Sequence, residues 1–250
     1  MSDIKERTRL QKLEYLLKQV DKIHVRNAAE ILNVSEMTIR RDISNSQGIF
    51  ALLGGYIIKI SQKSNNYFLL EQQDKNITEK MHIGKIAASL IENGDIVFFD
   101  CGTTISFIAS QIPHSVSFTA LCCSMNTFFI LQEKVNCEII LCGGQYSRDN
   151  ALVTSIQDQC VIDSVCTTKA FIAASGVDHQ YGLTCFKFNE AQIKRKAIAK
   201  TRTPIAIFDH TKFNKIYPAY IGDLSMFEFA ICDQVLPSKF DSRKVITELI

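Results

Sequence analysis

The segment Val25–Asn45 constrains the fold most, because it holds two short helical patterns separated by a tight turn. The apolar residues of the first pattern fall on one helix face, namely Val25, Ala28, Ala29 and Leu32. Asn33 can end this helix in the left-handed conformation, and the Ser35 hydroxyl can accept a free backbone N–H where the next helix begins. Ile39 and Ile43 lie one helical turn apart and should be buried together. This layout predicts a helix-turn-helix.

The polar side chains of the second helix project away from that apolar stripe, on the face that a DNA major groove would meet. Arg41 lies at the centre of this face and Thr38 near its N-terminal edge, so both can reach base edges or phosphates. Arg40 lies on the flank, where we expect a contact with the DNA backbone. The predicted DNA-contacting residues are Ser35, Met37, Thr38, Arg40, Arg41, Ser44 and Asn45. Taken alone, the two arginines also fit a small helical hairpin with a solvated basic face.

The flanking segments favour the DNA-binding interpretation. An upstream apolar stripe predicts a covering helix over residues 3–20 and consists of Leu10, Leu13, Leu17 and Val20. Downstream, the sequence IFALLGGYIIKI sets two β-prone segments around Gly54 and Gly55, which can adopt the positive φ of a two-residue hairpin loop. Three helices followed by a hairpin predict a winged helix-turn-helix over residues 1–60.

The rest of the chain is long enough for a second domain. A polar stretch at residues 61–76 is predicted to be a linker, and residues 77–250 can bury a sizeable core. No apolar run reaches the roughly 18 residues of a membrane span, and the amphipathic N-terminus is unlike a secretory signal, so we expect a cytoplasmic protein with no membrane partner. The nine cysteines show no C-x-x-C spacing and lie mostly in apolar surroundings. This pattern indicates reduced, buried thiols, with no metal site and no cofactor.

From His82 onwards, helix-like and strand-like segments alternate, which predicts an α/β domain with a mostly parallel sheet. The first helix is expected to span residues 82–95 and to end near Asn93-Gly94. The expected strands are 96–99, 118–122, 138–141, 171–174, 205–208 and 229–232, with helices near 105–111, 127–132 and 190–201. Because ligands of such sheets bind at the carboxyl ends of the strands, the polar residues found there are candidate site residues.

The strongest candidate follows the first strand, where Asp100-Cys101-Gly102-Thr103-Thr104 leads into a helix. Gly102 allows close backbone approach, while the two threonine hydroxyls and the free N–H groups of the helix start can hold an anion. A plain strand-to-helix turn explains the same residues. Loops at the ends of other strands add further candidates, namely Asn126, Gly143, Gly144, Gly176, Asp209 and Lys212.

Glu190 and Lys194 are the remaining candidate pair, one helical turn apart. Such a pair most often stabilises an exposed helix by a few tenths of a kcal/mol. Together with the other motifs, however, it resembles the DeoR family of bacterial transcriptional regulators. The motifs that carry this resemblance are SEMTIRRD, LLGGYI, Gly182-Leu183-Thr184, EAQIK at 190–194 and DHTKF at 209–213, and together they extend over nearly all of the chain.

The family resemblance implies a sugar-phosphate-sensing domain similar in fold to ribose-5-phosphate isomerase. It implies that Gly102, Thr103 and Thr104 hold a phosphate with Lys212 or Lys194 nearby, and that Asp100, Asn126 and Glu190 hold sugar hydroxyls. Many family members carry an Arg-Thr-His-Gly-Gly-like wing, whereas Leu52 and Leu53 precede the glycines in this sequence. This wing therefore lacks the polar residues that are often available in the family for minor-groove or phosphate contact.

The resemblance implies a homo-oligomeric repressor of a deoxyribonucleoside or sugar catabolic operon. Its partners would be double-stranded operator DNA and a phosphorylated sugar that releases it, with 2-deoxyribose-5-phosphate the best candidate. The alternative is an isomerase-like enzyme with an accessory DNA-binding head, in which Asp100, Glu190 or Asp209 would move a proton next to a carbonyl. A helix-turn-helix favours the repressor, because a metabolic isomerase has no use for one.

Overall fold

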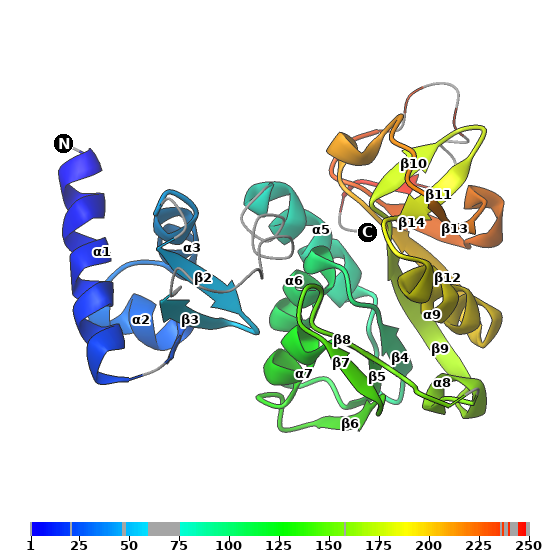
Figure 1. Ribbon diagram of the computed structural model, residues 1–250, viewed down its shortest axis with the longest axis horizontal. Helices are drawn as coiled ribbons and strands as arrows, with labels where there is room; N and C mark the ends of the chain where they lie inside the picture. The colour runs from blue at the N-terminus through cyan, green and yellow to red at the C-terminus, as the bar shows by residue number, and fades with distance from the viewer. Residues whose placement is uncertain are drawn as a thin grey trace. The chain divides into compact units, whose positions relative to one another are not determined.

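The computed structural model describes residues 2–20, 22–46, 49–59, 76–157, 159–235, 237, 240 and 245–248. The chain forms two compact units, Met1–Ile77 and Thr78–Ile250 (Figure 1). The predicted linker at 61–76 lies, apart from Asn76, outside the described residues. No helix in the described part of the chain is both long and apolar enough to cross a membrane.

The N-terminal unit is the predicted winged helix-turn-helix. Its elements in chain order are α1 (Ser2–Gln19), β1 (Ile23–His24), α2 (Val25–Leu32), α3 (Glu36–Ser44), β2 (Phe50–Leu53) and β3 (Tyr56–Lys59). The three strands form a sheet in the order β1-β3-β2, so the hairpin gains a third strand that the sequence did not reveal. Gly54 and Gly55 turn the hairpin with φ of 56° and 80°, the positive values that a two-residue loop requires.

The ends and the core of this unit follow the sequence pattern. Asn33 ends α2 with φ 52°, and the Ser35 hydroxyl accepts a hydrogen bond from the Thr38 backbone N–H at 3.2 Å. Ile39 is fully buried in the core that α1, α2, α3 and the sheet share. Leu52 of the wing packs into the same core. Its apolar character therefore serves packing, which explains why a polar residue is absent at this position.

The C-terminal unit is built on a seven-stranded sheet in the order β15-β14-β12-β9-β4-β5-β6, with every pairing parallel. Its strands are β4 (Ile96–Phe99), β5 (Phe118–Cys122), β6 (Cys137–Leu141), β9 (Thr167–Ala173), β12 (Thr201–Ile207), β14 (Phe229–Ile231) and β15 (Val245–Ile246). The chain moves outward from β4 to β6 and then returns to β9 on the other side of β4. The strand order therefore reverses between β4 and β9, the kind of place where open α/β sheets bind ligands.

Helices cover both faces of this sheet (Figure 1). The helices are α5 (Ile77–Ser89), α6 (Thr103–Gln111), α7 (Met125–Leu131), α8 (Val161–Ser164) and α9 (Phe188–Ala199), with single 3-10 turns at His210–Lys212 and Leu224–Met226. Alternate strand residues face opposite layers, so Phe99 joins the core under α5, α6 and α7, while Phe98 joins the core that contains α8 and α9. This arrangement is the α/β fold that the sequence predicts.

Two expectations need correction. The first helix of this unit begins at Ile77 and ends at Ser89, because the Glu92 backbone N–H donates to the Asp95 carboxylate at 2.8 Å and Gly94 adopts φ 85° in a turn. The sequence also did not predict two small antiparallel sheets. One has the order β10-β11-β13 and the other pairs β7 with β8; the strands are β7 (Gln145–Ser147), β8 (Leu152–Thr154), β10 (Gly176–Asp178), β11 (Gly182–Cys185) and β13 (Ala219–Gly222).

Candidate functional site

The exposed face of α3 carries most of the predicted DNA-contacting residues. Arg41 and Asn45 are exposed, and the side chain of Met37 is 40% exposed. Within the described residues no acidic side chain forms an ion pair with Arg41. Thr38 and Ser44 are half-buried. Arg41 is therefore the cation on this helix that is free to meet DNA.

Arg40 lies in a different environment. Its side chain is only 12% exposed and approaches the Glu36 carboxylate at 3.8 Å, one helical turn earlier. Burial lowers the pKa of its guanidinium, and the charge of Glu36 opposes that effect. Arg40 can therefore offer DNA only the outer part of its side chain.

In the C-terminal unit, a buried ion pair lies where the strand order reverses. Asp100 directly follows β4 and is fully buried, and its Oδ2 accepts a hydrogen bond from Lys194 of α9 and another, at 2.9 Å, from the Ala173 backbone N–H of β9. Lys194 Nζ also donates to the Ala173 carbonyl at 2.9 Å. Burial is the largest single influence and disfavours its charged form, but the nearby acidic groups, Asp100 first among them and Glu190 also, together outweigh that effect and raise the pKa of Lys194 above its ordinary value. Asp100 and Lys194 thus tie β4, β9 and α9 together.

The N-terminus of α6 opens beside this ion pair. Gly102 occupies the cap position in extended conformation and has no side chain to satisfy the first N–H groups of the helix. A Cβ on Gly102 would lie 2.2 Å from the Cβ of Ala173, so glycine is required here for packing against β9. Thr103 is half-buried and Thr104 is buried in the first turn. Free N–H groups and two hydroxyls together form a suitable place for an anion.

Glu190 lies one turn before Lys194 on α9 and has a partner that the sequence did not reveal. Asn150 Nδ2 donates to Glu190 Oε1 at 2.6 Å, and Asn150 is 5% exposed. The segment that carries Asn150 contacts the start of α7, because the Met125 backbone N–H donates to the Ala151 carbonyl at 2.9 Å. No local sequence pattern distinguishes Asn150, since its role depends on a residue 40 positions away.

Three other predicted residues follow the ends of two further strands of the same sheet. Asn126 is buried in the first turn of α7, after β5. Asp209 is fully buried after β12, and its Oδ1 caps the short turn at the Thr211 N–H. Lys212 Nζ lies 3.7 Å from Asp209 Oδ2, and the side chain of Lys212 is 19% exposed. These residues lie at the same edge of the sheet as Asp100.

The predicted glycines have mainly backbone roles. Gly143 and Gly144 form an exposed turn after β6, where Gly144 adopts φ 138° and packs against the Thr154 carbonyl. Gly176 begins β10, and a Cβ there would lie 2.3 Å from the Lys215 carbonyl. None of the contacts of these three glycines reaches Asp100, Glu190 or Lys194 among the residues that the structure describes. Their proposed role in ligand binding stays a prediction.

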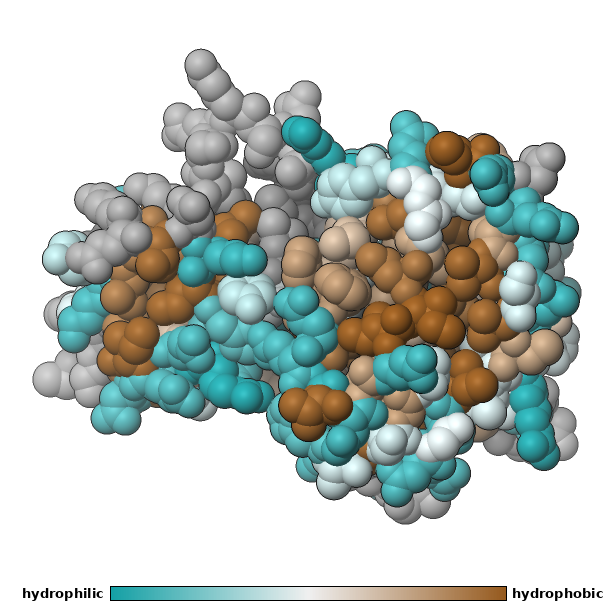
Figure 2. All heavy atoms as spheres, turned by 90° about the horizontal axis from the view of Figure 1, so that it is seen from below, coloured by the Kyte–Doolittle hydropathy of each residue, from teal (hydrophilic) through white to brown (hydrophobic). Residues whose placement is uncertain are grey.

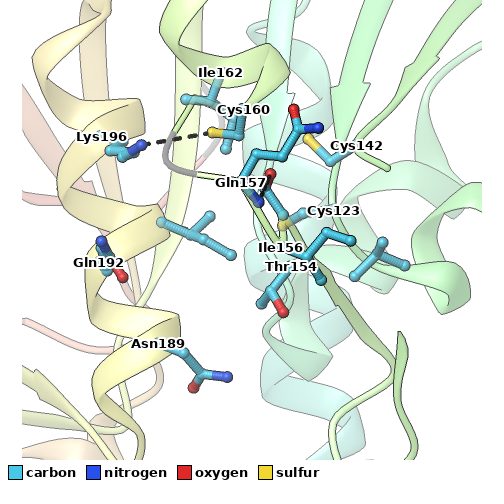
Figure 3. A pocket seen from close by; sticks show the side chains of 13 residues that line it. Cys123, Cys142, Thr154, Ile156, Gln157, Cys160, Ile162, Asn189, Gln192 and Lys196 are labelled. Atoms are coloured by element: carbon cyan, nitrogen blue, oxygen red, sulfur yellow. Dashed lines mark hydrogen bonds between the residues drawn. The ribbon is translucent and has the colours of Figure 1, made fainter. Parts of the chain in front are cut away.

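A separate cavity of about 310 Å³ lies between α9 and the ends of β5 and β6 (Figure 3). Its lining includes Cys123, Cys142 and Cys160, and Lys196 points toward Cys160. Lys196 also pairs with Asp163 at 2.7 Å, and this hydrogen bond is the main cause that lowers the pKa of Asp163 to about 2. Burial raises the pKa of the Cys142 thiol to about 12, so this thiol stays protonated. None of the predicted ligand-binding residues lines this cavity.

Comparisons with known proteins agree with these features. Residues 9–60 match the DeoR-like helix-turn-helix domain, and residues 75–234 match the DeoR C-terminal sensor domain. The chain is also 41% identical to the deoxyribose operon repressor of Escherichia coli K12 over 217 residues, which cover 87% of this chain and 86% of that relative. The chain belongs to the DeoR family.

As a DeoR-family member, the protein is a DNA-binding repressor with an N-terminal helix-turn-helix and a C-terminal sensor domain. A more distant relative, the transcriptional repressor GlcR of Bacillus subtilis, is 29% identical, covering 88% of this chain and 82% of its own length. Ribose-5-phosphate isomerase A of Methanocaldococcus jannaschii matches part of the structure with a TM-score of 0.41 and 12% identity, covering 56% of this chain and 55% of that one. That structural similarity is too low to support an argument about activity.

Proposed function

We propose that this DeoR-family protein represses a deoxyribonucleoside or sugar catabolic operon and leaves its operator when a phosphorylated sugar, best represented by 2-deoxyribose-5-phosphate, occupies the sensor unit. The observation that carries the proposal is the buried pair of Asp100 and Lys194 beside the N-terminus of α6, at the point where the strand order reverses. The 41% identity to the deoxyribose operon repressor of E. coli supports the choice of sugar. Repression would take place on operator DNA in the cytoplasm.

We place the phosphate at the N-terminus of α6. Lys194 already donates to Asp100 and to the Ala173 carbonyl, so its charge is neutralised by a buried partner. Lys212 is partly exposed, and its Nζ lies 3.7 Å from Asp209 Oδ2, which is longer than a hydrogen bond. Its side chain can therefore turn toward a phosphate at Thr103 and Thr104. Of the two lysines that the sequence left open, we therefore assign Lys212 to the phosphate.

Release would follow from linkage between the two ligands. The effector and the operator favour different global states, so each weakens the affinity for the other by the same factor.

A protein that reads symmetric half-sites needs at least two copies, which supports a homo-oligomer. Figure 2 shows apolar side chains gathered on one face of the sensor unit with hydrophilic ones around them, as at many interaction surfaces. A molar mass of 28.2 kDa by light scattering at working concentration would contradict the oligomer.

A thermal-shift screen of sugar phosphates tests the proposed effector. Ligand at 100 times its dissociation constant should stabilise the protein by about 2.7 kcal/mol. We expect a clear upward shift with 2-deoxyribose-5-phosphate and little or none with unphosphorylated 2-deoxyribose, because the latter cannot use the anion site. If no sugar phosphate shifts the transition, the proposed effector class is wrong.

The proposal also predicts that the sensor does not turn its ligand over. This expectation rests on the family, since the relative of this chain with 41% identity is a repressor and the chain carries the family's helix-turn-helix. Purified protein mixed with ribose-5-phosphate or 2-deoxyribose-5-phosphate should show no conversion by NMR beyond the rate without protein. Conversion that scales with protein concentration and disappears in Glu190→Gln would establish the isomerase alternative.

Damage to the anion site should give a repressor that binds DNA but responds poorly to effector. Thr104→Val removes a hydroxyl in the first turn of α6, and Lys212→Ala removes a charge-assisted hydrogen bond typically worth about 1.5 to 3 kcal/mol. Each variant should need about 10- to 100-fold more 2-deoxyribose-5-phosphate for release, since about 1.4 kcal/mol is tenfold. Lys85→Ala, at an exposed position of α5, serves as the control. Unchanged release midpoints in operator-binding titrations would place the phosphate elsewhere.

A further inference from the structure

Several buried side-chain oxygen atoms of the sensor unit have no hydrogen-bond partner among the described residues, and the hydroxyls of Thr127 and Thr167 are two of them. Asp100 Oδ1 and Asn150 Oδ1 are two more, and the other polar atom of each of these side chains is held by a residue of α9. Asp100 is fully buried and Asn150 is 5% exposed. Buried polar atoms are almost always hydrogen-bonded, because an unmet one costs free energy. Two unmet acceptors in one region therefore indicate a ligand that supplies donors.

The hydrogen bond to Glu190 fixes the orientation of the Asn150 amide. Its nitrogen lies 2.6 Å from Glu190 Oε1, and a carboxylate oxygen can only accept from it. The amide oxygen of Asn150 must then face the other way, as an acceptor. Asp100 is held in the same manner, because its Oδ2 is used by Lys194 and the Ala173 N–H, which leaves Oδ1 as the unused atom.

The side chains that carry the two unmet acceptors are both held by α9. Lys194, which holds Asp100, and Glu190, which holds Asn150, are one helical turn apart, a spacing of about 5 to 6 Å between Cβ atoms. Because the two holders occupy one turn of the same helix, the two oxygens are the acceptors that one small molecule with donors on two sides would meet.

The chemistry of Asp100 Oδ1 and Asn150 Oδ1 decides which part of the ligand binds to them. Both atoms are acceptors beside carboxylates, so a phosphate, which offers only acceptors and negative charge, would be repelled. Hydroxyl groups donate, and the ring form of 2-deoxyribose-5-phosphate carries two of them, at C1 and C3. We propose that Asn150 and Asp100 each accept one sugar hydroxyl, so that Asn150 is a specificity-determining residue of the sensor. This inference rests on the proposed function, since it concerns the same site.

Three probes test the assignment by calorimetric titration: 2-deoxyribose-5-phosphate, its 1,4-anhydro analogue without the C1 hydroxyl, and 2,3-dideoxyribose-5-phosphate without the C3 hydroxyl. The wild type should bind each analogue about 3- to 30-fold more weakly than the parent compound, the loss expected for one hydrogen bond that leaves a buried acceptor unmet. Asn150→Leu, which is close in size, should weaken the parent compound by a similar factor. It should bind one of the two analogues as well as the wild type does, because the missing hydroxyl is the one that Asn150 accepts.

Asn136→Leu is the matched control, since Asn136 is exposed before β6 at the opposite edge of the sheet and should not affect any of the three probes. Equal binding of the parent compound by the wild type and Asn150→Leu would overturn the assignment, as would an equal loss for all three probes, which indicates a structural role. Asn150→Ala repeats the test if the leucine variant does not fold. Equal binding of all three probes by the wild type overturns the proposal without any variant. Failure of the wild type to bind any sugar phosphate would instead reject the proposed function itself.

Discussion

Replacing Lys194 by methionine is expected to destabilise the sensor unit by about 3 to 5 kcal/mol, because the substitution leaves the charge of Asp100 buried without its partner. The side chains of Lys194 and Asp100 are only 3% and 0% exposed, so water cannot replace the lost interaction. The free energy of unfolding, measured with denaturant under conditions where the two units can be distinguished, gives the size of the effect.

Two control variants separate the effect of the unpaired Asp100 charge from the effect of removing any lysine. Lys85→Met on the exposed face of α5 should change stability by less than about 0.5 kcal/mol. The double variant Asp100→Asn, Lys194→Met should recover part of the loss, since it removes the unpaired charge. A Lys194→Met protein as stable as the wild type would show that the buried ion pair does not hold β4, β9 and α9 together.

Replacing Arg41 by alanine is expected to weaken operator binding by about 1 to 3 kcal/mol, or about 5- to 150-fold. Arg41 is exposed on α3, and no described acidic residue competes for its guanidinium, so it can meet base edges or phosphates directly. Fluorescence anisotropy with a labelled duplex obtained by in vitro selection measures the affinity. The folded state of the variant can be checked by circular dichroism.

Two other arginines serve as controls for that experiment. Arg26→Ala on α2 should cost less, because Arg26 lies outside α3 and its Nε is 3.7 Å from the Glu36 carboxylate. Arg202→Ala, at an exposed position of the sensor unit, should leave operator affinity unchanged. If a folded Arg41→Ala protein bound the operator with wild-type affinity, the assignment of α3 as the DNA-reading helix would be wrong.

The fold was largely predictable because its main elements carry strong local signals. Strands buried on both faces read as continuous apolar runs, so Ile96–Phe99 and Phe118–Cys122 were predicted with the observed bounds. The caps at Asn33 and Ser35 were equally visible, since each depends on one residue at a helix end. Short strands such as Gly176–Asp178 have too few residues to show alternation, so their sheet became visible only in the structure.

The site was only partly predictable, because its key contacts join residues far apart in the sequence. Glu190 and Lys194 share a helix and matched the pattern of an exposed pair, yet Lys194 is buried against Asp100, 94 positions earlier. The role of Gly102 in packing against Ala173 likewise depends on the pairing of β4 with β9. Local periodicity gives the position of such residues at a strand end but not their partners.

Operator affinity measured as a function of 2-deoxyribose-5-phosphate concentration tests the central claim most directly. If effector and operator favour different states of the protein, the operator dissociation constant should rise with effector and level off about 5- to 150-fold higher, the range typical of allosteric coupling. Unphosphorylated 2-deoxyribose should cause no such rise. An operator affinity that stays constant at concentrations of 2-deoxyribose-5-phosphate that saturate the sensor unit would contradict the account.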